Sequence, residues 1–78
     1  MINYAPFWET LKKKEISTYY LINNCGISSN TINSIRQGKG ISTLIINDLC
    51  NILECSVSDI LTHTPDSKPF RRQPNNDK

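Results

Sequence analysis

Four serines, each followed by a short stretch with apolar residues at helical spacing, constrain the fold of this chain more than any other feature. Serine is a preferred N-cap, because its side-chain oxygen accepts a hydrogen bond from a first-turn N–H group that has no partner within the helix. The four expected caps are Ser17, Ser28, Ser42 and Ser56. No strand-length run of alternating apolar and polar residues stands out. The pattern therefore predicts short helices with tight links and little sheet.

Helix-ending residues and apolar spacing together predict five short helices in an all-α bundle. Pro6 suits the first turn of the first helix, which we expect to end near Lys14. Gly26 is expected to end the second helix in the left-handed conformation, and Gly38 and Gly40 to end the third. The expected apolar faces consist of Phe7, Trp8, Leu11, Tyr20, Leu21, Cys25, Ile32, Ile35, Ile45, Leu49, Ile52, Leu53, Val57, Ile60 and Leu61. Ser56 and Asp59 have the spacing of a capping box that would start the fifth helix.

The length of 78 residues limits the chain to one small domain, which we place at residues 1–62. Residues 63–78 contain three prolines among polar residues, and we expect a disordered, basic tail there. This tail is either without a role, an arm that contacts phosphates through Arg71 and Arg72, or a docking segment built on Phe70. No apolar run approaches the roughly 20 residues of a membrane span, and the first residues do not read as a signal peptide. We therefore expect a cytoplasmic protein that does not contact a membrane.

The residue types that could serve in catalysis or metal binding are few, and their spacing matches no catalytic or metal-binding motif. Cys25, Cys50 and Cys55 match neither a zinc motif nor a redox motif, so we expect reduced thiols. His63 has no nucleophile that we can place beside it, and the acidic residues form no convincing dyad. The segment 38–40 (GKG) is too short for a phosphate-binding loop. We expect no enzymatic activity, no metal and no cofactor.

Charge is unevenly distributed along the chain, although the net charge is only +2. Residues 11–40 carry five basic residues and one acidic residue, whereas residues 41–62 carry three acidic residues and no basic one. Such a division favours a domain that presents one basic part to a polyanion. The alternative is that Lys12, Lys13 and Lys14 are simply the solvated end of a helix.

Residues 17–37 have the pattern of a helix-turn-helix. This motif needs a residue tolerant of positive φ in its turn, which Gly26 supplies, and an apolar residue directly after it, which Ile27 supplies. Leu21 and Cys25 on one helix must then meet Ile32 and Ile35 on the next. Each of these features is common in small helical proteins, but the whole set, with one helix before it and two after, is moderately specific.

The sequence resembles the Cro/repressor-type helix-turn-helix domains of phages, mobile elements and low-GC Gram-positive bacteria. The likeness covers roughly residues 2–62, and the segments that carry it are residues 4–8 (YAPFW), 16–22 (ISTYYLI), 26–32 (GISSNTI), 49–55 (LCNILEC) and 57–61 (VSDIL). It implies a lambda-repressor-like DNA-binding domain of five helices, with the third helix (about residues 28–37) as reader and binding usually as a dimer. One departure is Ile22, where this family usually has alanine, and we expect the bulkier side chain to shift the angle between the two helices.

The outward positions of the third helix are short, polar and uncharged. Asparagine can make a bidentate contact with adenine, and serine can bond to several base edges. A merely solvated face would more often carry Glu and Lys, which are better helix formers than Asn and Ser. The expected base contacts are Ser29, Asn30, Asn33 and Ser34. The alternative is a neutral surface in a chain rich in asparagine.

Phosphate contacts need donors at the edges of the same motif. Thr18 begins the second helix and Ser28 the third, while the remaining candidates cluster where the third helix ends. The expected phosphate contacts are Thr18, Ser28, Arg36, Gln37 and Lys39. The lysines at 12–14 would add long-range attraction, and one of Tyr19 and Tyr20 should be exposed, since adjacent residues cannot both face inward.

The sequence thus predicts a transcriptional regulator, a repressor, that binds an operator in double-stranded DNA with its third helix in the major groove. A single short reader helix reaches few base pairs, which favours a homodimer. Val57, Ile60 and Leu61 either form the dimer contact or close the core. Nothing in the sequence implies a small-molecule ligand. The alternative function is a protein-interaction module on the same scaffold, such as an antitoxin-like or host-takeover factor.

Overall fold

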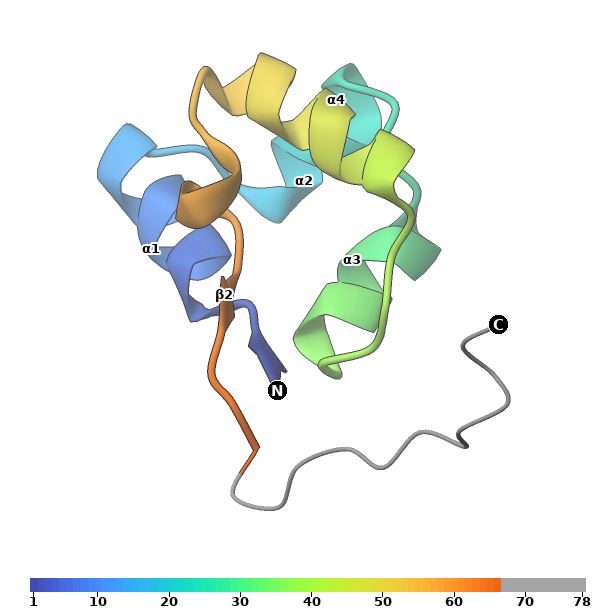
Figure 1. Cartoon of the computed structure of the whole chain (residues 1–78). Coiled ribbons are helices and arrows are strands. Elements are labelled where there is room, and N and C mark those ends of the chain that lie inside the picture. The colour runs from blue at the N-terminus through green and yellow to red at the C-terminus, as the bar shows by residue number, and fades with distance from the viewer. Residues whose placement is uncertain (67–78) are drawn as a thin grey trace.

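The computed structural model describes residues 1–66, and within them the chain forms a helical domain closed by a short two-stranded sheet (Figure 1). The elements in chain order are β1 (Ile2–Asn3), α1 (Ala5–Lys14), α2 (Thr18–Asn24), α3 (Ser29–Arg36), α4 (Thr43–Leu53), the 3₁₀ helix η1 (Val57–Asp59) and β2 (Thr62–His63). In Figure 1, α4 runs across the top of the domain, with α1 on the left and α3 on the right. The helical fold predicted from the sequence is confirmed.

The predicted count of five helices is wrong, because the segment after Ser56 forms only one 3₁₀ turn. Its predicted capping interaction is present, since the Asp59 carboxylate accepts a hydrogen bond from the Ser56 backbone N–H at 3.2 Å. A cap lowers the cost of starting a helix but does not extend it. The chain leaves the turn at Ile60 and enters β2 two residues later, so no second turn forms.

The other three predicted N-caps are confirmed. Each serine side chain accepts a hydrogen bond from the backbone N–H three residues later, at 3.1 Å in every case. The pairs are Ser17 with Tyr20, Ser28 with Thr31, and Ser42 with Ile45. Each cap satisfies one N–H group that would otherwise lack a partner at the start of its helix.

Each of the four α-helices is followed by a residue in the left-handed conformation. Gly26 (φ +79°) and Gly38 (φ +76°) take this conformation as predicted. Glu15 (φ +58°) follows α1 and Glu54 (φ +51°) follows α4, and the sequence offered no signal for either, because non-glycine residues rarely adopt it. After Glu15, the N–H of Ile16 donates a hydrogen bond to the carbonyl of Leu11. The left-handed conformation of Glu15 thus lets one of the last carbonyls of α1 find a partner.

The core contains ten buried apolar residues drawn from the four α-helices and from the segments beside the helices. They are Tyr4, Phe7, Leu11, Leu21, Ile27, Ile32, Ile35, Leu49, Leu53 and Ile60. Most of the expected inward positions are therefore confirmed. Trp8, Cys25, Ile45, Ile52 and Leu61 are only partly buried and pack around this core.

One predicted core position is wrong. Tyr20 is 47% exposed and lies outward together with Tyr19, because Leu21 alone fills the buried position of the short helix α2. Val57, which was expected either to form a dimer contact or to close the core, is 52% exposed. The residue of this segment that enters the core is Ile60. Buried Thr10, which was not expected, donates a hydrogen bond from its hydroxyl to the Asp59 carbonyl at 2.8 Å and so ties α1 to η1.

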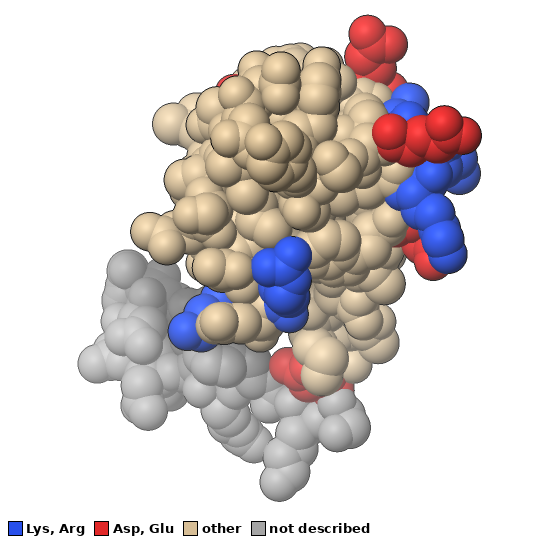
Figure 2. Space-filling model, turned by 180° about the vertical axis from the view of Figure 1, so that it is seen from behind, with Lys and Arg blue, Asp and Glu red and all other residues tan. Residues whose placement is uncertain are grey.

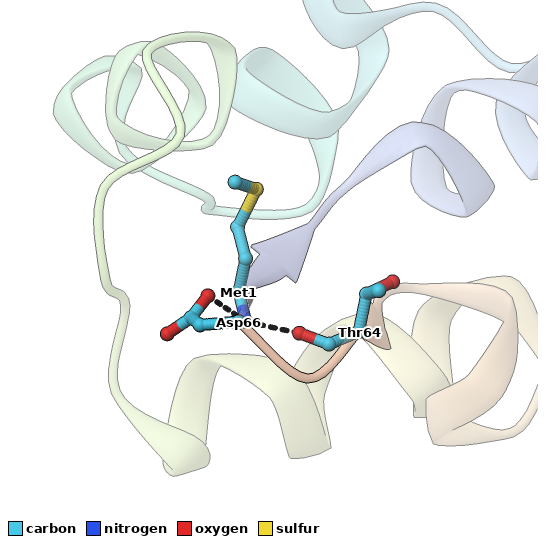
Figure 3. Close-up of polar contacts among 3 residues, drawn as sticks. All are labelled: Met1, Thr64 and Asp66. Atoms are coloured by element: carbon cyan, nitrogen blue, oxygen red, sulfur yellow. Dashed lines mark hydrogen bonds and ion pairs between the residues drawn. The ribbon is translucent and has the colours of Figure 1, made fainter. Parts of the chain in front are cut away.

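The two chain ends of the described region lie side by side. Strands β1 and β2 pair antiparallel, with Ile2 opposite His63 and Asn3 opposite Thr62. The Met1 amino group donates to the Thr64 carbonyl and lies 3.1 Å from Asp66 Oδ1 (Figure 3). Residues 63–66 of the expected tail therefore lie against the first residues of the chain. The rest of that tail, including Phe70, Arg71 and Arg72, lies outside the described residues.

Within residues 1–66, no helix is both long enough and apolar enough to cross a bilayer.

Candidate nucleic-acid interface

The turn between α2 and α3 has the geometry that the sequence predicted for a helix-turn-helix. Gly26 occupies the left-handed region, and the N–H of Ile27 reaches back to the carbonyl of Leu21 at 3.1 Å. The Ile27 side chain is 4% exposed and seals the corner. Ser28 then caps α3 directly. The turn therefore has little freedom, and it sets the direction in which α3 leaves α2.

Helix α3 is sharply two-sided. Ile32 and Ile35 are each 2% exposed and attach it to the core. On the opposite side Ser29, Asn30 and Asn33 are exposed, as expected for residues that contact a partner. Ser34, the fourth expected base contact, is half-buried. The outward face thus presents amides and hydroxyls within two helical turns.

Asn33 has a neighbour on α3 that sequence reasoning did not assign to it. Arg36 donates a hydrogen bond from Nη1 to Asn33 Oδ1 at 3.0 Å. The Arg36 guanidinium also lies over the ring of Trp8 on α1, with Cζ 5.6 Å from the ring centroid. Trp8 in turn packs edge-on against Phe7 at 4.9 Å between ring centroids. The spacing of three residues between Asn33 and Arg36 was a usable signal, whereas the contact with Trp8 was not.

The five expected phosphate contacts lie in three places. Thr18 is half-buried in the first turn of α2. The Ser28 hydroxyl lies 2.9 Å from the Thr31 hydroxyl and accepts the Thr31 N–H, so it is already engaged at the start of α3. Gln37 and Lys39 are exposed beside Gly38 where α3 ends, and Arg36 is exposed just before them. The structure therefore groups Arg36, Gln37 and Lys39 and leaves the other two apart.

A tyrosine from outside the motif holds the loop that follows α3. The Tyr4 hydroxyl donates to the Lys39 carbonyl at 2.8 Å, and the Tyr4 side chain is 6% exposed. The Lys39 N–H donates a hydrogen bond to the Ser34 carbonyl at 2.8 Å. Both backbone groups of Lys39, its N–H and its carbonyl, are therefore hydrogen-bonded. Sequence reasoning treated Tyr4 only as part of the opening of α1, because a partner 35 residues away leaves no local signal.

The predicted separation of basic and acidic parts is not found at the end of α1. Lys13 and Lys14 line the same hollow as Glu54 and Asp59, so acidic side chains lie close to the lysine run. Figure 2 shows blue and red side chains mixed at one edge of that view. Further blue groups and a red group lie lower on a face that is mostly uncharged. Lys13 and Lys14 are therefore not part of an all-basic surface.

The described cysteines Cys25, Cys50 and Cys55 are all unpaired thiols. Burial raises the pKa of the Cys55 thiol, and the nearby Cys50 and Asp59 raise it further, whereas Lys14 lowers it. Among residues 1–66, no three His, Cys, Asp or Glu side chains come together as a metal site would require. The structure thus offers Cys55 as a protonated, packed thiol at neutral pH.

Comparisons with known proteins agree with this geometry. The family model for Cro/C1-type HTH DNA-binding domains matches residues 7–66, which include α1 from its third residue onward, all of α2 to α4, and the turn between α2 and α3. The crystal structure of the transcriptional regulator VanUg is similar to this fold, with a TM-score of 0.75 over 83% of this chain and 87% of that chain, at 22% sequence identity. No curated protein sequence gives a significant match. Because the family match covers most of the chain and all of its helix-turn-helix, this chain belongs to the Cro/C1-type family of helix-turn-helix DNA-binding domains.

Proposed function

We propose that this protein is a cytoplasmic, sequence-specific transcriptional repressor whose helix α3 reads the major groove of its operator. The observation that carries the proposal is the two-sided character of α3. Two buried isoleucines hold the helix rigidly, while exposed Asn30 and Asn33 lie on its free side. A rigid helix with short polar side chains fits a base-reading element, because the major groove admits a helix and exposes donors and acceptors on every base pair.

The base contacts in this proposal are Ser29, Asn30, Asn33 and Ser34. Asn30 and Asn33 are three residues apart on a helix, so their side chains lie on neighbouring positions of one face. Asparagine side chains offer both donors and an acceptor, while the serine hydroxyls donate or accept as the base requires. Ser29 begins the helix and Ser34 is partly covered, so the two asparagines carry most of the readout.

The phosphate contacts in this proposal are Thr18, Ser28, Gln37 and Lys39. Such contacts set the register of the helix on the duplex without reading its sequence. Lys39 supplies a positive charge from a loop whose backbone is held by Tyr4. Arg36 has the charge for the same contact, but its guanidinium is already engaged by Trp8 and Asn33.

The proposed active form is a two-fold dimer. An eight-residue helix is about 12 Å long and so faces only a few base pairs. Two copies with reader helices about 34–36 Å apart would contact two half-sites on one side of the duplex. Of the three residues predicted for the dimer contact, Ile60 is fully buried, which leaves the exposed Val57 and the half-buried Leu61.

The test is fluorescence anisotropy against genomic fragments that include the protein's own promoter, at low and near-physiological salt. We expect tight binding to few fragments, with a slope of log affinity against log salt of about −5 if each subunit neutralises about three phosphates. Alanine at both Asn30 and Asn33 should abolish the preference between fragments. Alanine at both Asn47 and Asn51, which are exposed on α4, is the matched control and should change nothing. Reporter expression from the bound promoter distinguishes repression from activation.

A second function, a protein-interaction module, is favoured by one observation: the outward face of α3 before Arg36 carries no charge. One result would favour this second function over DNA reading. It is weak binding to every DNA fragment that is lost as salt rises and is unaffected by the Asn30 and Asn33 substitutions.

A further inference from the structure

Trp8, Arg36 and Asn33 form a continuous chain of contacts from α1 to the outward face of α3. The Arg36 guanidinium lies over the Trp8 ring at 5.6 Å and donates to Asn33 Oδ1 at 3.0 Å. Trp8 is itself held by Phe7, which is fully buried. Trp8 and Arg36 also line one open hollow of about 390 Å³ between the start of α1 and the end of α3. The Arg36 guanidinium is thus held by two contacts in the DNA-free protein.

This chain of contacts determines which way the Asn33 amide points. A guanidinium carries only donors, so the Asn33 atom that meets Arg36 must be the oxygen. The oxygen then lies toward Arg36, one turn further along the helix, and the NH2 group is left free. Bidentate recognition of adenine needs both amide atoms, the oxygen accepting from N6 and the nitrogen donating to N7. An oxygen already bonded to Arg36 is poorly placed for that contact.

We propose that Trp8 and Arg36 are positioning residues that make Asn33 a hydrogen-bond donor toward the DNA, so that it selects guanine, with its N7 and O6 acceptors, over adenine. The inference rests on the proposed function of α3, because Asn33 must face a base pair. It assigns Trp8, a residue of α1 with no base contact of its own, a part in sequence specificity. It also gives Arg36 a different task from the phosphate contact that its charge alone suggests.

Cation–π stacking supplies the reason for Arg36 to stay in place. A guanidinium over an indole ring gains about 0.5–1 kcal/mol at an exposed site and about 2 kcal/mol when water is excluded. Docking α3 against a duplex removes water from its surface, which strengthens this attraction and the bond to Asn33. The stacked guanidinium keeps N–H groups that do not bond to Asn33, so any phosphate contact of Arg36 would be made from this held position.

The experiment is the selection of binding sites from a random-sequence DNA pool, performed with the wild-type chain and four variants. The variants are Asn33→Ala, Arg36→Met, Trp8→Phe and Lys39→Met. Arg36→Met removes the donors and the charge but keeps a long flexible side chain. Lys39→Met is the matched control, because it removes one positive charge near the same helix end without touching Trp8 or Asn33. The position read by Asn33 is the one whose base preference disappears in Asn33→Ala.

At that position we expect the wild-type chain to prefer guanine over adenine by about fivefold or more. Arg36→Met should erase or reverse this preference, and Trp8→Phe should shift it in the same direction with an unchanged salt slope. Lys39→Met should weaken binding to all sequences alike. Because the proposed dimer loses one phosphate contact in each subunit, this variant should reduce the magnitude of the salt slope by about 2. A merely structural role of Trp8 would lower stability or overall affinity but would not move one base preference.

Two results would overturn the positioning role and leave DNA reading intact. One is an adenine preference in the wild-type chain, and the other is an Arg36→Met variant that behaves as Lys39→Met does. An unchanged base preference in Asn33→Ala would instead overturn the reading role of Asn33 and this inference together.

Trp8 is the single tryptophan of the chain, so its fluorescence reports the contact directly. Arg36→Met should change the Trp8 emission of the DNA-free protein, whereas Lys39→Met should not. Identical emission in both variants and in the wild-type chain would mean that the contact does not form in solution. This measurement also reports whether each variant is folded.

Discussion

Replacing Tyr4 by phenylalanine isolates one long-range hydrogen bond. The Tyr4 hydroxyl donates to the Lys39 carbonyl at 2.8 Å, and the side chain is 6% exposed. Phenylalanine keeps the aromatic ring and its burial, so the packing of this residue in the core is retained. The substitution therefore removes only the bond that joins the start of α1 to the loop after α3.

The expected loss of stability depends on whether the Lys39 carbonyl finds another hydrogen-bond partner. A typical hydrogen bond contributes about 0.5–1.5 kcal/mol net, and a buried acceptor left without a partner costs about 1–3 kcal/mol. The Lys39 side chain is exposed, so water can replace the lost hydroxyl at least in part. We therefore expect Tyr4→Phe to lower the free energy of unfolding by about 1 kcal/mol. In a domain of this size that corresponds to a Tm lower by roughly 4–8 °C.

Urea and thermal denaturation followed by circular dichroism measure this difference. Tyr19→Phe is the matched control, because it deletes the same hydroxyl from a residue that is 72% exposed. The control should change the free energy of unfolding by less than about 0.5 kcal/mol. Equal stability of Tyr4→Phe and Tyr19→Phe would show that the Tyr4 hydrogen bond adds nothing to the stability of the fold.

Three further substitutions or measurements test other parts of the structure. Gly26→Ala should lower the free energy of unfolding by about 1–2 kcal/mol because of the positive φ alone, since a Cβ there meets no atom within 4 Å. Gly40→Ala, where φ is not positive, should be nearly neutral, and chemical denaturation compares the two variants. Leu49→Ala should lower the free energy of unfolding by about 2–5 kcal/mol because Leu49 is fully buried, whereas Leu44→Ala at a 75% exposed position should have little effect. The raised pKa of Cys55 predicts slower alkylation by iodoacetamide than for an unfolded-chain thiol at mildly alkaline pH. The stability linked to that thiol should be present below its ordinary pKa and lost as pH rises through the raised value, and Cys55→Ala should remove this pH dependence.

The helix starts and the inner face of the reader helix were predictable because their causes are local. A serine hydroxyl that accepts from the N–H three residues later needs only its own turn of chain, as at Ser17, Ser28 and Ser42. The positive φ of Gly26 is likewise a property of one residue type. Helical spacing places Ile32 and Ile35 on one side of α3, so the opposite side follows by geometry.

Tyr20 was misplaced for a physical reason. It was assigned to the core from spacing alone, but the seven-residue helix α2 buries only Leu21, and Tyr20 remains at its edge. The left-handed residues Glu15 and Glu54 had no signal, because packing on both sides of the turn imposes a conformation that glutamate does not favour.

Local sequence accounts for the helical class, three of the helix starts, the glycine-based turn and the polar outward face of α3, because each depends on residues within one or two turns of each other. The contacts between distant groups are set by the packed fold. Tyr4 reaches Lys39 across 35 residues, Thr10 reaches Asp59 across 49, and Arg36 lies over Trp8. These partners depend on the angles at which helices cross. Those angles are set by the combined packing of the whole core, which no single segment of the sequence contains.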